Sequence, residues 1–274
     1  MMNNQSKGLK RNTIDKYYTK CEIVDKCVNV FKEMVQINDD DLIIEPSAGN
    51  GSFIESIKSL TDNYLFYDLH PENEEIIKQD YLELDASNFM QFNQVHIIGN
   101  PPFGRQSSLA LKFIKKSTTF CNTISFILPK SFKKDSLKKR FPLDFHLVYE
   151  EDLPSNAFLV NEEEYDVPCV FQIWQKKEFY RIPITKLEPN GFQFVKKHEN
   201  PDISFRRVGV NAGAIDTNIE EKSIQSHYFI KFTNNKSLGQ NLCNLYMIDY
   251  EFNNTVGPKS ISKQELISKF NNVL

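Results

Sequence analysis

The residues Asn100, Pro101, Pro102 and Phe103 follow the apolar run 95–99 and end it in an unusual way. Two successive prolines cannot donate ladder hydrogen bonds, and each fixes its own backbone angle φ, so a strand must stop here. The resulting turn is rigid, and the Asn100 amide and the Phe103 ring project from it. One interpretation is a structural turn with a core phenylalanine. The other is a site that needs an amide and an aromatic ring in fixed positions.

A glycine-bearing loop precedes this motif and offers a second possible site. The segment EPSAGNGSF places Glu45 at the end of an expected strand, and Gly49 and Gly51 before an expected helix near Ser52. Glycine allows positive φ and close approach of the backbone to a ligand, although a tight strand-to-helix turn uses the same freedom. No Gly-Lys-Ser/Thr follows, which excludes a Walker loop. Ile54 occupies the third glycine position of the dinucleotide fingerprint, which disfavours an NAD-dependent enzyme.

Two further acids stand where strands are expected to end. Asp68 closes the strand after the glycine loop, and Asp80 follows at the expected end of the third strand. An acid at the position of Asp68 can accept both hydroxyls of a ribose. Taken singly, either residue is also typical of a solvated loop. In this order they resemble a nucleoside pocket, with the ribose at Asp68 and a purine amino group at Asp80. The glycine loop has no lysine or arginine for phosphate, which favours a nucleoside without a polyphosphate.

Hydrophobic patterns predict the elements that must hold these residues. Apolar residues at helical spacing indicate a helix over 21–36. Residues 41–60 indicate a strand, a loop and a helix, residues 108–117 a helix, and further strands are expected at 63–71, 95–99, 121–129, 145–154 and 167–175. Strands that alternate with helices imply right-handed crossovers and ligands at the carboxyl ends of the strands. We therefore predict an α/β fold with a Rossmann-like, mostly parallel sheet. The polar segment 161–166 (NEEEYD) is expected to be a solvated loop.

The character of the chain changes after Trp174, where short β-prone pieces are punctuated by Pro, Gly and Asn. We place a domain boundary near residue 178, with a domain over 1–178 and a small β-rich domain over 179–274.

Composition limits the class of protein. No apolar run approaches the ~20 residues of a membrane span, and the polar start lacks the apolar middle of a secretory signal. The five cysteines form no C-x-x-C pair, which argues for reduced thiols and against a structural zinc site. We expect a cytoplasmic or nucleic-acid-associated intracellular protein that is not secreted, with no metal and no membrane partner.

Basic residues suggest a polyanionic partner. Residues 179–274 carry 12 Lys and Arg against 9 Asp and Glu, although the whole chain has a net charge of −3. The segment 129–141 is rich in lysine just after an expected strand end, and SFRRVG adds two arginines. The candidate nucleic-acid contacts are Lys130, Lys133, Lys134, Arg206 and Arg207. A solvated helix face is the alternative interpretation of the lysines.

Four motifs together resemble the class I S-adenosylmethionine-dependent N6-adenine methyltransferases. DKYYTK (15–20) resembles the element that closes over the methionine part of the cofactor, and EPSAGNGSF resembles the loop that holds the methionine end, with Glu45 towards its amino group. Asp68 and Asp80 match the acids for ribose and adenine, and NPPF matches the catalytic motif. Their order is that of the γ arrangement of DNA adenine methyltransferases. The chain departs from the pattern because no proline follows the threonine of DKYYTK, and residues after 178 match no known target-recognition domain.

The resemblance implies S-adenosyl-L-methionine as cofactor and residues 1–178 as the methyltransferase domain, with 179–274 a possible nucleic-acid recognition domain. The implied catalytic residues are Asn100, Pro101, Pro102 and Phe103. The implied cofactor-binding residues are Tyr17, Tyr18, Thr19, Glu45, Pro46, Ala48, Gly49, Gly51, Phe53, Asp68, Asp80 and Asn100.

The motif then has a chemical use. If the Asn100 side-chain oxygen and the Pro101 carbonyl accept the hydrogens of an exocyclic adenine amine, the nitrogen can attack without prior loss of a proton. Phe103 would stack on the base. The predicted substrate is adenine in a polynucleotide, with DNA slightly favoured over RNA. The sequence also leaves open methylation of glutamine in a protein, and an inactive subunit that binds nucleic acid.

Overall fold

The computed structural model describes residues 17–250 and 259–274. The polar start of the chain, and residues 15 and 16 of the DKYYTK element, lie outside the described residues. The chain divides into two units, Met1–Pro183 and Ile184–Leu274.

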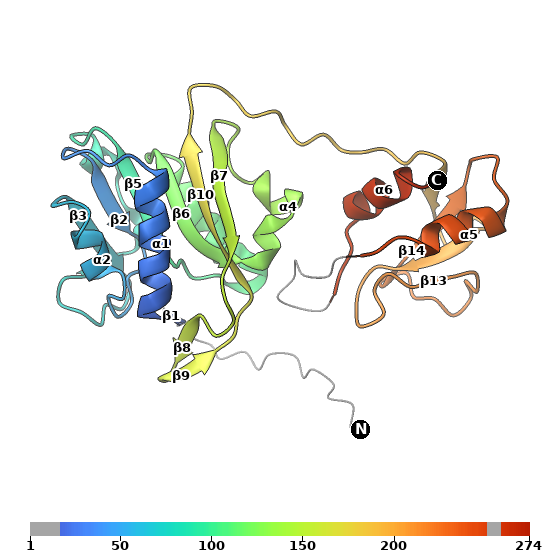
Figure 1. Cartoon of the computed structure of the whole chain (residues 1–274), viewed down its shortest axis with the longest axis horizontal. Coiled ribbons are helices and arrows are strands. Elements are labelled where there is room, and N and C mark those ends of the chain that lie inside the picture. The colour runs from blue at the N-terminus through green and yellow to red at the C-terminus, as the bar shows by residue number, and fades with distance from the viewer. Residues whose placement is uncertain (1–16, 251–258) are drawn as a thin grey trace. The chain divides into compact units, whose positions relative to one another are not determined.

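A seven-stranded sheet forms the centre of the first unit (Figure 1). Its order is β4-β3-β2-β5-β6-β10-β7; the first five strands in this order are parallel, and β10 is antiparallel to both of its neighbours. The expected α/β class with a mostly parallel sheet is confirmed. The strands are β2 (Leu42–Glu45), β3 (Tyr64–Asp68), β4 (Ile77–Lys78), β5 (Val95–Gly99), β6 (Thr123–Pro129), β7 (Phe145–Asp152) and β10 (Cys169–Lys176).

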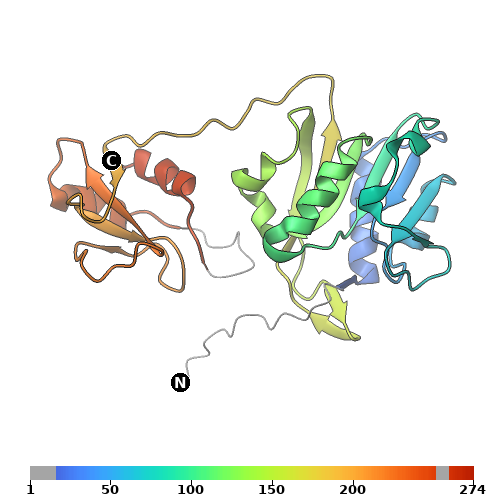
Figure 2. The same ribbon diagram turned by 180° about the vertical axis from the view of Figure 1, so that it is seen from behind.

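Helices cover both faces of this sheet, which explains why β2, β5 and β6 consist of uninterrupted buried residues. The helix α1 (Cys21–Met34) lies over the face seen in Figure 1 and contacts α2 (Ile54–Lys58). The helix α3 (Ser108–Ser117) lies over the opposite face (Figure 2). A short helix, α4 (Asp135–Lys138), follows β6.

A small antiparallel sheet joins two parts of the chain that are far apart in the sequence. It consists of β1 (Tyr18–Thr19), β8 (Phe158–Val160) and β9 (Glu163–Tyr165), in the order β1-β8-β9. The prediction of a solvated loop over 161–166 is therefore wrong. Asn161 and Glu162 both have positive φ (50° and 65°), as a two-residue type I′ hairpin turn requires, and the acidic residues after them form a strand.

The second unit contains an antiparallel sheet with its own core, in the order β11-β14-β12-β13. Its strands are β11 (Phe192–Val195), β12 (Ile203–Arg206), β13 (Ile215–Asp216) and β14 (His227–Phe232). The helices α5 (Leu238–Tyr246) and α6 (Lys263–Asn271) contribute Leu245, Leu266 and Phe270 to this core. Neither helix was predicted from the sequence, although each begins with a capping box, at Ser237 in α5 and at Ser262 in α6.

Candidate active site

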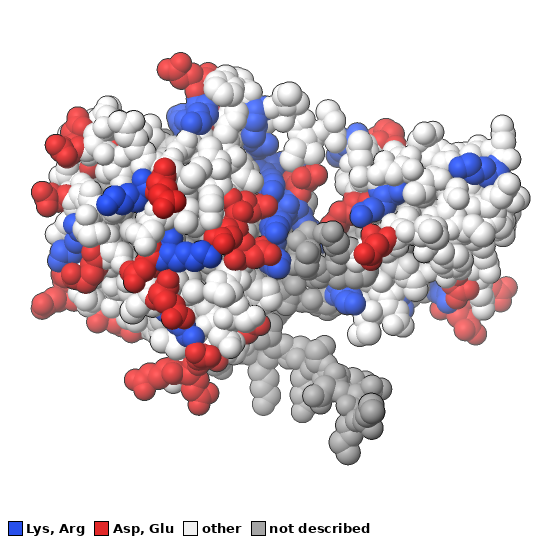
Figure 3. All heavy atoms as spheres, in the orientation of Figure 1, with Lys and Arg blue, Asp and Glu red and all other residues white. Residues whose placement is uncertain are grey.

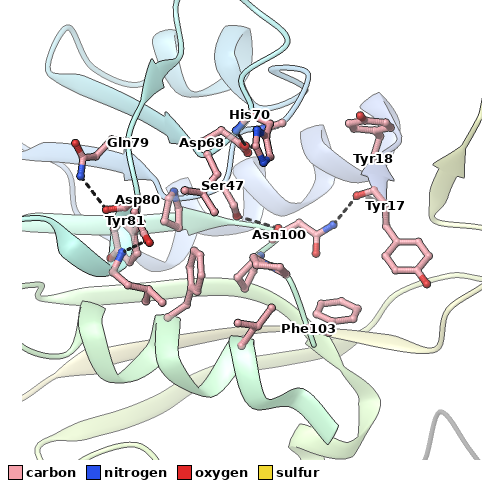
Figure 4. Close-up of a pocket in the computed structure, with 18 residues that line it drawn as sticks. Tyr17, Tyr18, Ser47, Asp68, His70, Gln79, Asp80, Tyr81, Asn100 and Phe103 are labelled. Carbon is pink, nitrogen blue, oxygen red and sulfur yellow. Dashed lines mark hydrogen bonds between the residues drawn. The ribbon is translucent and has the colours of Figure 1, made fainter. Parts of the chain in front are cut away.

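A cavity of about 470 Å³ lies at the carboxyl ends of the parallel strands of the first unit (Figure 4). The chain adds β3 and β4 on one side of β2, and then β5 and β6 on the other side. The carboxyl ends of β2 and β5 therefore form a topological switch point, where open α/β sheets bind ligands. The predicted residues that line the cavity are Tyr17, Tyr18, Pro46, Gly49, Asp68, Asp80, Asn100, Pro101, Pro102 and Phe103.

The glycine loop (residues 46–53) is held against the end of β3 by the side chain of Asp68. The Gly49 N–H donates to Oδ2 of Asp68 at 2.8 Å, and the His70 N–H donates to Oδ1 at the same distance. Gly51 has φ of +88°, and a Cβ atom there would lie 2.7 Å from Cδ1 of Ile54. The loop conformation therefore requires glycine at this position and fixes the Asp68 carboxylate at the cavity wall.

Asp80 is fixed in a comparable way at the other end of the cavity. Its Oδ1 accepts a hydrogen bond from the Leu82 N–H at 2.9 Å and caps a 3₁₀ turn over Tyr81–Glu83. Tyr81 is buried, and its ring stacks on Phe113 with centroids 5.2 Å apart. An acceptor thus stands beside an apolar wall, which suits a flat heterocycle with an amino group.

Eight lining residues were not identified from the sequence: Ser47, Leu69, His70, Gln79, Tyr81, Leu82, Leu109 and Phe113. Two of them immediately follow a predicted acid, Leu69 after Asp68 and Tyr81 after Asp80. For these two residues, the position directly after a predicted acid was a signal in the sequence.

Asn100 is held from two sides. Its side-chain nitrogen donates to the Tyr17 carbonyl at 3.1 Å and to Oγ1 of Thr19 at 3.2 Å. The Ser47 hydroxyl donates to the Asn100 backbone carbonyl at 3.1 Å. In Figure 4 the side-chain oxygen of Asn100 points away from Tyr17 and towards the side of the cavity where Phe103 lies.

Aromatic rings gather beside Phe103. The Tyr17 ring is stacked with Phe103 at 6.4 Å between centroids and lies 5.6 Å from the Tyr165 ring of β9. Phe158 of β8 meets Tyr17 edge-on at 6.2 Å. The hairpin that the sequence analysis took for a loop thus brings Tyr165 close to the NPPF motif.

Five of the predicted cofactor-binding residues do not line the cavity: Thr19, Glu45, Ala48, Gly51 and Phe53. Glu45 lies behind the wall with only 2% of its surface exposed, and its Oε2 has no hydrogen-bond partner among the described residues. Burial raises the pKa of Glu45 well above its ordinary value, and the nearby charge of Asp68 raises it further.

The predicted nucleic-acid contacts have partners within the protein itself. Lys130 and Lys133 pair with Asp152 of β7 at 2.8 and 3.0 Å. In the view of Figure 3, acidic residues lie among the lysines and arginines of the surface. These ion pairs neutralise part of the positive charge that the sequence suggests.

The two arginines of the second unit are likewise bound to backbone carbonyl groups. Nε of Arg206 donates to the Val208 carbonyl at 3.1 Å, and the Arg207 guanidinium donates to the Gln225 carbonyl at 2.7 Å. The Arg207 guanidinium also lies 5.5 Å from the centroid of the Tyr228 ring. Both side chains therefore have a structural role in the second unit.

Across residues 17–250 and 259–274, no helix combines the length and apolar character needed to cross a membrane. The same residues contain no group of three or more His, Cys, Asp or Glu side chains arranged to hold a metal ion.

Solved structures that are described as methyltransferases match part of the chain at low sequence identity. A candidate RNA methyltransferase from Pyrococcus horikoshii matches with a TM-score of 0.47 and 13% identity, covering 62% of this chain and 92% of that chain. The methyltransferase subunit of a type I restriction-modification system from Streptococcus thermophilus matches with a TM-score of 0.44 and 14% identity, covering 58% and 45%. An S-adenosylmethionine-dependent methyltransferase from Anabaena variabilis matches with a TM-score of 0.40 and 12% identity, covering 61% and 89%. No curated protein matches the chain.

Comparison with family models identifies the chain more directly. The model described as the EDM2 methyltransferase-like domain matches residues 36–178, just over half of the chain. The matched segment contains β2, β5, the glycine loop and the NPPF motif. The chain therefore belongs to the family of EDM2 methyltransferase-like domains.

Proposed function

We propose that this protein transfers a methyl group from S-adenosyl-L-methionine to the N6 amine of adenine in a polynucleotide, with DNA slightly favoured over RNA. The observation that supports the proposal best is the hydrogen bonding of Asn100. Its amide nitrogen is bound to the Tyr17 and Thr19 acceptors, and its oxygen remains for a ligand in the cavity. A fixed acceptor beside a group of aromatic rings suits an amine on a flat heterocycle.

The cavity also fits the cofactor. Two carboxylates, Asp68 and Asp80, line it and are oriented by backbone donors, which suits the two ribose hydroxyls and the amino group of an adenosine. No lysine or arginine is among the described residues that line the cavity, as expected for a nucleoside without a phosphate. Pro46, Gly49 and Tyr18 would border the methionine part. When bound, the cofactor supplies a methyl group on a positively charged sulfur that is already a strong electrophile.

The protein's own contribution is to position the amine. The lone pair of an exocyclic adenine nitrogen is delocalised into the ring, so the nitrogen is a weak nucleophile. We assign the Asn100 side-chain oxygen and the Pro101 carbonyl as acceptors of its two hydrogens, which favours a tetrahedral nitrogen whose lone pair is free to attack. The nitrogen sheds one proton to water after the transfer, because amide oxygens are too weakly basic to retain it. Positioning and electrostatic stabilisation therefore supply the catalysis.

The aromatic rings would hold the base. An adenine within a duplex must leave its helix to reach a site of this kind. Stacking on Phe103, with Tyr17 and Tyr165 beside it, would contribute ~1–3 kcal/mol for the base. These rings come from the turn after β5, the N-terminal segment and β9, so residues distant in the sequence form one surface.

The variant Asn100→Ala tests the proposal. It should abolish methyl transfer to adenine-containing DNA and RNA oligonucleotides and leave the cofactor Kd within about threefold of the wild-type value. Asn88→Ala is the matched control, because Asn88 is exposed and lies outside the cavity. Oligonucleotides in which each adenine is replaced by unsubstituted purine, the same ring system without the 6-amino group, should accept no methyl group. Full activity of Asn100→Ala, or transfer to the purine oligonucleotides, would contradict the proposal.

A further inference from the structure

Both hydrogens of the Asn100 side-chain amide form hydrogen bonds within the protein. An asparagine amide has two donor hydrogens and one acceptor oxygen, and the nitrogen here faces the Tyr17 carbonyl at 3.1 Å and Oγ1 of Thr19 at 3.2 Å. If the amide turned over, its oxygen would face the Tyr17 carbonyl, and two acceptors would oppose each other. The amide is therefore held in one orientation, with its oxygen towards the cavity (Figure 4).

The segment that fixes this orientation is itself anchored. We call residues 17–20 the hook. Thr19 pairs with Phe158 of β8, and the Lys20 N–H donates to the Ala157 carbonyl at 3.1 Å. The Lys20 ammonium also forms an ion pair with Glu164 of β9. The hook is thus attached to the hairpin that carries Tyr165.

The Thr19 side chain contacts Asn100 but does not reach the cavity. Its side chain is buried, with 5% of its surface exposed, and it does not line the cavity. A cofactor contact was expected for this residue, but the structure puts its hydroxyl behind Asn100.

We propose that Thr19 is a positioning residue, which together with the Tyr17 carbonyl fixes the Asn100 amide so that its oxygen can meet only a hydrogen-bond donor of the substrate. The inference rests on the proposed function and narrows it. An exocyclic amino group is accepted, whereas a carbonyl oxygen at the same position of the base is rejected, because two acceptors would face each other.

Removing the Thr19 hydroxyl should have the effect on kcat of losing one hydrogen bond to a catalytic group. Thr19→Val keeps the shape of the side chain and removes the hydroxyl. We expect kcat to fall by about three- to tenfold, with KM and the cofactor Kd unchanged. Thr19→Ser keeps the hydroxyl and should restore kcat. Thr123→Val is the matched control, because Thr123 is also a buried threonine but lies at the start of β6, away from the cavity.

A substrate-free measurement tests the contact itself. The side-chain amide signals of Asn100 in a ¹⁵N–¹H spectrum can be assigned from their loss in Asn100→Ala. Thr19→Val should shift one proton of this pair and speed its exchange with water, whereas Thr19→Ser and Thr123→Val should leave it close to wild type. Unchanged Asn100 signals in Thr19→Val would overturn the inference.

The two measurements separate the possible failures. If the amide signals respond as expected but wild-type protein methylates neither DNA nor RNA, the proposed function fails and the contact stands. If wild type is active and Thr19→Val has the same kcat, the positioning role is wrong. An equal loss in Thr123→Val, or a weaker cofactor Kd in Thr19→Val, would also overturn the role.

Discussion

Replacing Asp68 by asparagine keeps the size of the side chain and removes its charge. In the structure the two carboxylate oxygens each accept one backbone N–H, from Gly49 and from His70, at 2.8 Å. Asparagine has a single acceptor oxygen, so one of these donors would face an NH₂ group. The loss of one such hydrogen bond should lower the free energy of unfolding by roughly 1 kcal/mol.

The effect of Asp68→Asn on cofactor binding should be larger than its effect on stability. Hydrogen bonds from ribose hydroxyls to a carboxylate involve a charged acceptor and are worth ~1.5–3 kcal/mol each. A neutral amide can accept only one of them. We expect the Kd to rise by about 10- to 100-fold, which corresponds to roughly 1.4–2.8 kcal/mol.

Calorimetric titration with S-adenosylhomocysteine, which has no methyl group to transfer, measures this change directly. Asp85→Asn is the matched control, because Oδ1 of Asp85 also accepts a backbone N–H, from Ser87 at 2.9 Å, and Asp85 does not line the cavity. A Kd within twofold of wild type in Asp68→Asn would refute the ribose assignment. An equal loss of affinity in Asp85→Asn would show that the effect comes from losing any carboxylate that accepts a backbone N–H, and not from the cavity.

Three further predictions follow from burial, stacking and charge. Burial and the charge of Asp68 raise the folded-state pKa of Glu45, so the stability linked to its proton is present below the unfolded pKa and is lost as pH rises through the folded pKa. Glu45→Gln should remove this loss, which urea unfolding at a series of pH values above the ordinary carboxyl pKa measures, and parallel stability curves of wild type and Glu45→Gln would contradict it. Tyr165→Ala should raise the KM for polynucleotide by about tenfold, because a stacking ring is removed, while Tyr165→Phe should not; equal KM values in steady-state assays would count against the stacking role. Lys139 and Arg140 have no side-chain hydrogen bond or ion pair with other described residues. If they touch phosphates, replacing both by alanine should reduce the salt slope of polynucleotide binding by about one to two, and an unchanged slope in anisotropy titrations rules this out.

Much of the fold was predictable because its signals are local. Apolar runs, the glycine loop and the prolines after Gly99 each act within a few residues, so β2, β5 and β6 and the helices α1 and α3 appear close to where the sequence indicates them. The cavity follows from the same signals, because parallel strands bring their carboxyl ends to one edge of the sheet.

The group of aromatic rings beside Phe103 was less predictable because it depends on the pairing of strands that are far apart in the sequence. Tyr17 and Tyr165 are brought together by the pairing of β1 with β8, and the acidic residues before Tyr165 favoured a loop. A type I′ turn at two non-glycine residues gives only a weak signal in the sequence.

The ion pairs of the lysine-rich segment could not be predicted, for a related reason. Lys130 and Lys133 follow β6, and their partner Asp152 ends β7, so the ion pairs form only once the sheet has assembled. A count of lysines along the sequence cannot show which of them are neutralised by a neighbouring strand.

The most direct test of the account is the identity of the methylated product. Wild-type protein would be incubated with a cofactor that carries a deuterated methyl group, together with equal amounts of DNA, RNA and protein substrates, and the digests analysed by mass spectrometry. We expect the label in N6-methyladenine nucleosides, with the deoxynucleoside in excess. Label in a cytosine nucleoside or in protein glutamine, or an absence of label from all three substrates, would contradict the proposed function.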